Sequence, residues 1–110
     1  MTSEDTTSNG PLSGLRVIEL GHFIAAPFCT RVLADLGADV IKVEPPGRGD
    51  PVRTWGEMPE GHKSSVWWSV HGRNKQSVTV DLKKPEGIQL VKELIKHADA
   101  VVENFKPGQL

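Results

Sequence analysis

Hydrophobic positions follow two different spacings along the chain, one typical of strands and the other typical of helices. Short runs rich in valine and isoleucine predict four strands, over residues 16–20, 39–44, 77–82 and 100–105. The segment between the first two strands is long enough for a helix and too long for a hairpin. We therefore expect these two strands to be parallel and joined by a right-handed crossover.

Two amphipathic helices are predicted between the strands. The first begins near Pro27 and ends at Gly37, and four apolar residues at helical spacing are expected to form its buried stripe: Cys29, Val32, Leu33 and Leu36. The second begins at Pro85, and its apolar face consists of Ile88, Val91, Ile95 and Ala98. Two consecutive strand–helix–strand units predict an α/β fold, a Rossmann-like open parallel sheet with flanking helices.

Two further segments have no clear periodicity. Residues 45–62 are rich in proline, glycine and charge and predict a long loop, which in a compact domain is usually a functional lid or a disordered segment. The segment around Trp67 and Trp68 is compatible with a short helix or with an irregular buried stretch.

Composition excludes several classes of function. Thirteen basic and fourteen acidic residues in 110 leave a formal charge of −1, so charge gives no reason to expect binding to nucleic acid or to a membrane. The single cysteine fits a reducing compartment, and no metal is expected because His62, His71 and His97 lack metal-ligand spacing. Residues 1–10 lack the features of a signal peptide and are expected to be a disordered tail. These features predict a soluble, cytoplasmic protein.

The loop after the first strand, GHFIAAP, is a candidate ligand site because ligands of open α/β sheets bind at the carboxyl ends of the strands. A dinucleotide fingerprint has three glycines there, whereas this loop has only Gly21. The side chains of His22, Phe23 and Ile24 would block a pyrophosphate, which argues against an ordinary NAD site. Glu44, at the end of the second strand, is interpreted either as a ribose-binding acid or as a solvated strand end.

Three long motifs, in this order, resemble the N-terminal part of the family III coenzyme A transferases: PLSGLRVIELGHFIAAPFCTRVLADLGADVIKVEPPGRGD, GRNKQSVTVDLKKPEG and ADAVVENFKPG. This family includes formyl-CoA transferase and carnitine CoA-transferase, and α-methylacyl-CoA racemase is related to it. The resemblance covers residues 11–110, which it implies are the N-terminal part of a larger Rossmann-like domain that binds coenzyme A. It also implies an interlinked homodimer.

The resemblance implies an activity and a set of binding residues. Members of the family move coenzyme A from an acyl-CoA donor to a carboxylic acid acceptor, through covalent intermediates on an aspartate nucleophile. Matched position by position, the family's cofactor contacts fall on nine residues of this chain: His22, Phe23, Ile24, Ala25, Arg48, Val80, Lys83, Asn104 and Phe105. Where some transferases have an arginine near the adenine, this chain has Pro45, and Arg48 or Arg53 is the candidate replacement.

The family's catalytic aspartate is expected downstream of Leu110, so no catalytic residue is assigned within this segment. Its aspartates are interpreted as helix-surface, strand-end or turn acids: Asp35, Asp39, Asp50, Asp81 and Asp99. Two other functions remain open. One is an acyl-CoA racemase or isomerase on the same scaffold, and the other is a coenzyme A-binding module without turnover.

Overall fold

A computed structural model describes residues 10–109 of the chain. The elements follow one another in the order β1 (Arg16–Glu19), α2 (Ala25–Asp35), β2 (Asp39–Glu44), η1 (Pro51–Thr54), α3 (Val66–His71), β3 (Lys75–Thr79), α4 (Pro85–Lys96) and β4 (Ala100–Val102). The predicted tail at residues 1–10 falls almost entirely on residues 1–9, which lie outside the described part. None of the helices in residues 10–109 is long and apolar enough to cross a membrane.

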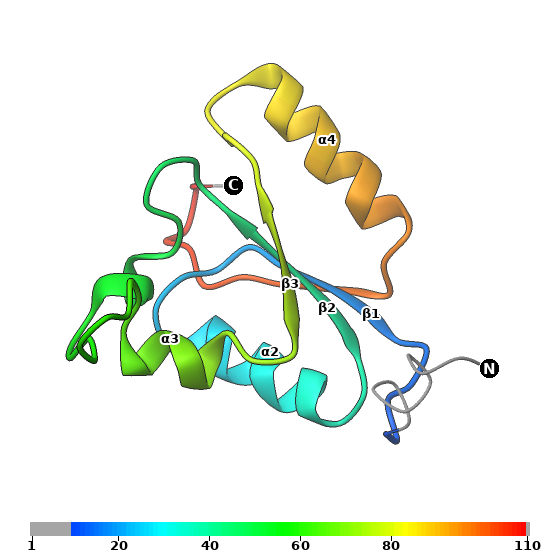
Figure 1. The fold of residues 1–110 in the computed structure, drawn as a ribbon. Helices are drawn as coiled ribbons and strands as arrows, with labels where there is room; N and C mark the ends of the chain where they lie inside the picture. Colours follow the sequence, from blue (N-terminus) through cyan, green and yellow to red (C-terminus); the bar gives the residue numbers. More distant parts are fainter. Residues whose placement is uncertain (1–9, 110) are drawn as a thin grey trace.

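The four strands form one parallel sheet in the order β3-β2-β1-β4. Helix α4 covers one face of the sheet, and α2 and α3 lie on the other (Figure 1). The predicted Rossmann-like open sheet is therefore confirmed. The chain passes from β1 through α2 to β2, on one side of β1, and α4 later returns it to β4, on the other side of β1. The direction in which successive strands are added to the sheet therefore reverses between β1 and β4. In this class of fold such a reversal opens a crevice at the carboxyl ends of the two strands.

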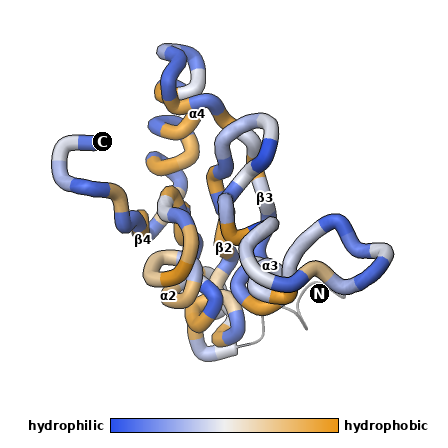
Figure 2. The backbone as a smooth tube through the Cα atoms, turned by 90° about the vertical axis from the view of Figure 1, so that its left-hand side faces the viewer, coloured by the Kyte–Doolittle hydropathy of each residue, from blue (hydrophilic) through white to orange (hydrophobic). Residues whose placement is uncertain are grey.

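Alternation along the strands gives the sheet two unlike faces. Ile18, Leu20 and Val43 point toward α4 and form an apolar core with Val80 and Val91. Figure 2 shows hydrophobic positions along β2 and, interrupted by hydrophilic ones, along α4. The opposite face has a smaller apolar cluster of Val17, Ala34, Ala38 and Val40. It also buries three charged strand residues, which are Glu19, Lys42 and Glu44.

Of the predicted buried stripe of the first helix, only Leu33 packs against the core, and the other three positions are wrong. Cys29 and Val32 in α2 and Leu36 at its C-cap are exposed. The helix instead buries a face of small residues: Ala26, Pro27, Thr30 and Ala34. Small side chains let the helix backbone approach the sheet closely, and a hydroxyl at Thr30 meets the carboxylate of Glu19 there. Apolar spacing was therefore a misleading guide to the buried face.

Other predicted boundaries differ by a few residues. The third strand begins at Lys75 rather than at residue 77 and ends at Thr79, while β4 ends at Val102 rather than at residue 105. The segment with the tryptophan pair is the helix α3, begun by Ser65, whose Oγ accepts the backbone N–H of Trp68 at 3.1 Å. Gly37 follows α2 with φ of 106°, a left-handed conformation that stops a helix at little cost for glycine.

Candidate functional site

A groove of about 650 Å³ runs between α4 and the carboxyl ends of the strands, on the apolar side of the sheet. Its walls are mainly apolar and include Leu20, Val43, Val80, Leu82, Ile88, Val91, Ile95, Val101 and Phe105. The polar side chains that line it include His22, Glu44, Asp81, Lys83, Lys92 and Gln109. A concave apolar surface with a few polar side chains is the usual form of a site for a large organic ligand.

Four of the nine predicted binding residues line this groove. They come from three different loops or strand ends and are His22, Val80, Lys83 and Phe105. The rings of His22 and Phe105 meet edge to face, with centroids 5.6 Å apart, where the loops after β1 and β4 approach each other. The sheet thus brings together residues that are more than 80 positions apart in the sequence.

Sequence reasoning missed Lys92 and the part played by α4. Ile88, Val91 and Ile95 were assigned to the face of a helix packed on the sheet; Val91 and Ile95 do pack on the core, whereas Ile88 is exposed. All three also form one wall of the groove. The only sequence signal for Lys92 was its place directly after Val91, a residue predicted to be buried.

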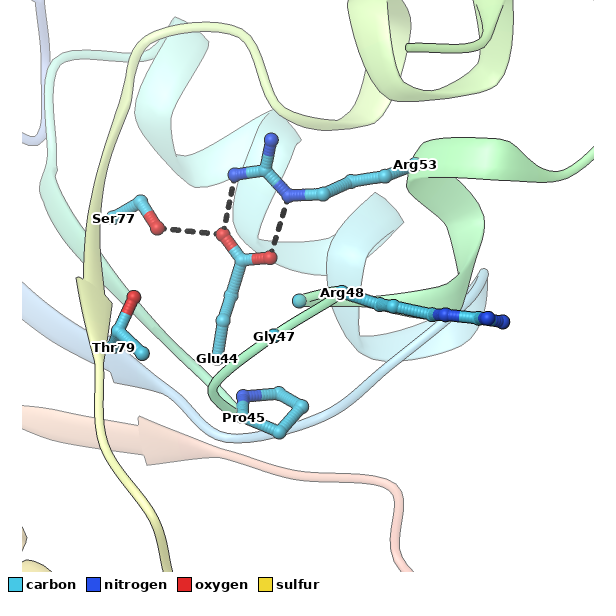
Figure 3. Close-up of a pocket in the computed structure, with 8 residues that line it drawn as sticks. Glu44, Pro45, Gly47, Arg48, Arg53, Ser77 and Thr79 are labelled. Carbon is cyan, nitrogen blue, oxygen red and sulfur yellow. Dashed lines mark hydrogen bonds and ion pairs between the residues drawn. The ribbon is translucent and has the colours of Figure 1, made fainter. Parts of the chain in front are cut away.

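A second, smaller cavity of about 160 Å³ lies beyond Glu44 and Pro45, which line both cavities. Predicted residue Arg48 lines this smaller cavity rather than the groove. Figure 3 shows the Arg48 side chain extending away from the carboxylate of Glu44, while Ser77 and Thr79 reach the cavity from β3. Arg48 is exposed, so its guanidinium is accessible to a ligand.

Glu44 is neither a solvated strand end nor an open ribose site, because its carboxylate is buried and fully engaged. Arg53 donates from Nε at 2.7 Å and from Nη2 at 2.6 Å, the Ser77 hydroxyl donates at 2.5 Å, and the Asp50 backbone N–H donates at 2.7 Å. Burial alone would raise the pKa of Glu44, but these hydrogen bonds outweigh it and lower the pKa to about 2. The guanidinium of Arg53 also lies 3.7 Å over the Trp68 ring, so Arg53 is a structural partner here.

Side chains from elsewhere in the fold hold the backbone of the first loop. Asn104 accepts the His22 N–H through Oδ1 and donates to the His22 carbonyl through Nδ2, both at 3.0 Å. A Cβ on Gly21 would collide with Oδ1 of Asn104, so the one glycine of the loop allows this contact. Asp50 Oδ1 accepts the Phe23 N–H at 3.1 Å. Predicted residue Asn104 therefore lies behind the loop and supports it.

The remaining predicted residues do not line either cavity. Phe23 is 43% exposed and meets Trp55 edge to face at 5.9 Å, while Ile24 and Ala25 are exposed at the start of α2. Phe23 has a φ of 65°, which is uncommon for a residue with a Cβ. The loop thus turns His22 toward the groove and Phe23 toward the opposite side.

A buried network of four charges lies between the sheet and α2, and the sequence interpretation did not foresee it. Lys42 pairs with Glu19 and with Asp50 at 2.7 Å each, and Lys75 pairs with Glu19 at 2.8 Å. The Thr30 hydroxyl donates to Glu19 at 2.7 Å. Two positive and two negative side chains, each at most 2% exposed, balance one another. Asp50 does act as a turn acid, since it accepts the Val52 N–H at the start of η1, but its burial and its pairing with Lys42 were not predicted.

Within residues 10–109, no cluster of three or more His, Cys, Asp or Glu side chains is arranged to hold a metal ion. Burial lowers the pKa of His71, and the nearby Arg31 and Lys75 add to this effect.

Comparison with known proteins agrees with the motifs and the fold. The model of CoA-transferase family III matches residues 12–110. The chain is 57% identical over 100 residues to succinyl-CoA–D-citramalate CoA-transferase of Chloroflexus aurantiacus, covering 91% of this chain and 25% of that protein. It is 46% identical over 106 residues to human succinyl-CoA:glutarate CoA-transferase, covering 96% of this chain and 24% of that protein.

A solved structure supports the same assignment. The crystal structure of a CAIB/BAIF family protein from Brucella suis matches with a TM-score of 0.82 and 47% identity, over 90% of this chain and 27% of that one. The chain spans about a quarter of the length of the curated relatives it matches. Because the motifs, the parallel sheet and the family model agree over nearly all of its residues, the chain belongs to CoA-transferase family III.

Proposed function

We propose that this chain forms the coenzyme A-binding part of an enzyme that moves coenzyme A from an acyl-CoA to a carboxylic acid. The observation that carries the proposal is the apolar groove at the carboxyl ends of the strands, with Lys83 and Lys92 in its lining. Family membership supports the reaction, and the groove supports the ligand.

The groove suits the parts of coenzyme A. An adenine ring and a pantetheine arm need apolar walls, which Val80, Ile88 and Phe105 offer. Phosphates need ammonium or guanidinium groups. The groove offers Lys83 and Lys92, and the smaller cavity beside it offers Arg48. All three side chains are exposed and form no ion pair with another described residue. Together with the first loop and Asn104, these residues make up the proposed binding set.

The two carboxylates that line the groove are already engaged. Glu44 is bound by Arg53, and Oδ1 of Asp81 accepts the backbone N–H of Lys83 at 2.9 Å. Glu44 is therefore not free to attack a thioester carbonyl, and the bond to Lys83 makes Asp81 the turn acid that the sequence predicted. The proposed nucleophile is therefore an aspartate in a part of the full-length protein outside these residues, which would form an acyl anhydride and release the coenzyme A thiolate.

The names of the relatives suggest the substrate class. Several of the similar proteins are succinyl-CoA transferases named for the acceptors citramalate, malate or glutarate. We therefore propose succinyl-CoA as donor and a dicarboxylic acid as acceptor. A homodimer and a cytoplasmic location belong to the same proposal, the latter because the single cysteine fits a reducing compartment.

The proposal is tested with the full-length protein, succinyl-CoA and a panel of mono- and dicarboxylic acids, with the new acyl-CoA separated by chromatography. We expect coenzyme A to move to a dicarboxylic acid, and residues 1–110 alone to be inactive. Epimerisation of a 2-methylacyl-CoA without exchange of the acid would instead identify a racemase. Coenzyme A binding without either reaction would identify a binding module.

A further inference from the structure

The first loop of this fold binds an internal anion, the carboxylate of Asp50 from the loop after β2. In dinucleotide-binding folds, backbone N–H groups at the turn from the first strand into the first helix bind a ligand phosphate. Here the Phe23 N–H donates to Oδ1 of Asp50 at 3.1 Å, and the same oxygen accepts the N–H of Val52 at 2.9 Å. The other carboxylate oxygen lies 2.7 Å from Nζ of Lys42. Asp50 is fully buried, so these contacts are shielded from water.

The carboxylate of Asp50 thus receives the kind of contacts that a phosphate receives in a dinucleotide site, namely backbone N–H groups and a lysine. A phosphate brought to the same N–H group would meet this negative charge. The phosphates of a ligand are therefore directed away from the start of α2 and toward the lysines of the groove. This accounts for a loop that has side chains where a dinucleotide fold has glycines.

The contact also fixes an unfavourable backbone conformation. Phe23 has a positive φ, which residues with a Cβ adopt only when their surroundings impose it. The preceding residue, His22, is held from the other side by Asn104. Asp50 and Asn104 therefore hold two successive residues of the loop from opposite sides, and Asp50 holds the strained one.

We propose that Asp50 is a positioning residue that takes the place of a bound phosphate at the first loop, fixes the backbone of Phe23 and thereby holds His22 toward the groove for contact with an acyl-CoA. The inference rests on the proposed function for its consequence in turnover, while its structural part stands on the contacts of Asp50. Asp50 acts through the loop backbone and does not itself touch the substrate.

The test compares Asp50→Ala with wild type and with Asp39→Asn in the full-length protein. Asp39 is a matched control because its carboxylate pairs with Arg16 at 3.0 Å in an exposed site at the other end of β2. For Asp50→Ala we expect the KM for succinyl-CoA to rise roughly tenfold, since the Phe23 N–H loses its acceptor. We expect Asp39→Asn to leave it unchanged.

Hydrogen exchange supplies the readout that a purely structural role would not move. In Asp50→Ala, peptides containing residues 21–24 should exchange roughly tenfold faster, while peptides from α4 and β4 keep their wild-type rates. Unchanged exchange at residues 21–24, or an equal rise in all peptides, would overturn the positioning role. If Asp50→Ala does not fold, Asp50→Asn decides: its Oδ1 still accepts the Phe23 N–H but carries no charge, so peptides containing residues 21–24 should exchange faster than in wild type, by less than in Asp50→Ala, and an unchanged rate would overturn the positioning role. A wild-type protein that neither binds nor turns over acyl-CoA would refute the proposed function, and the exchange result would still decide the role of Asp50.

Discussion

Replacing Glu44 with glutamine should expose how much the ion pair at the end of β2 stabilises the fold. Glutamine has nearly the volume of glutamate and mimics its protonated form, so the substitution removes charge without opening a cavity. Arg53, which is 31% exposed, would keep access to water, but it would lose both charge-assisted bonds to the carboxylate.

The expected magnitude follows from the pKa of Glu44, which the fold lowers from 4.5 to about 2. That difference corresponds to about 3 kcal/mol of stability, at 1.36 kcal/mol per pH unit. Because the pKa in the folded state lies below that in the unfolded state, the stabilisation is complete above pH 4.5 and is lost as the pH falls toward 2. Glu44→Gln should therefore be costly at about pH 7 and nearly neutral at about pH 2.

Hydrogen exchange of peptides from β2 and β3 measures this local stability in the full-length protein. At neutral pH those peptides should exchange roughly 100-fold faster in Glu44→Gln than in wild type, and the ratio should approach one in acid. Glu93→Gln is the matched control, since Glu93 pairs with Lys96 at an exposed site and should contribute under about 0.5 kcal/mol. A ratio that stays constant between neutral and acidic pH would refute the reasoning.

Three further predictions concern the groove, the core and the surface. Lys83→Gln should raise the KM for acyl-CoA roughly tenfold, with a smaller change in kcat, whereas Lys96→Gln, outside the groove lining, should change neither in steady-state assays. Val91→Ala should cost about 2 kcal/mol, seen as a lower thermal unfolding midpoint, because Val91 is buried in the core beneath α4; an unchanged midpoint would contradict its place there. Residues 1–110 alone should self-associate in size-exclusion chromatography through the exposed apolar face of α2, and Val32→Lys with Leu36→Lys should reduce this; a monodisperse wild-type monomer would contradict the idea.

The sequence was a good guide where backbone pattern decides the outcome. The second strand was predicted with its observed bounds, because DVIKVE has β-branched residues between clear helix-stop and turn signals. The parallel arrangement followed from the length of the crossover alone. The gathering of His22, Val80, Lys83 and Phe105 around one groove followed from the family motifs and from the rule that loops meet at the carboxyl edge.

The sequence failed where side chains from distant segments decide the environment. Hydropathy treats Cys29 as a core residue and Asp50 as a surface residue, and both assignments are reversed in the structure. Asp50 is buried because Lys42, Phe23 and Val52 meet it there, and no local pattern records those partners. Similarly, the engagement of Glu44 depends on Arg53 and Ser77, which approach from η1 and β3.

The buried charges between the sheet and α2 also specify how the strands align. Glu19 lies directly opposite Lys42 in the pairing of β1 with β2, and both face α2. A slip of one residue in either strand would turn one of these charges into the apolar layer under α4, which contains Val91, without its partner. Such misaligned sheets would be strongly disfavoured, whereas a purely apolar interior would tolerate them more easily. The network therefore makes one alignment of the strands the only one in which every buried charge is paired, whatever its net contribution to stability.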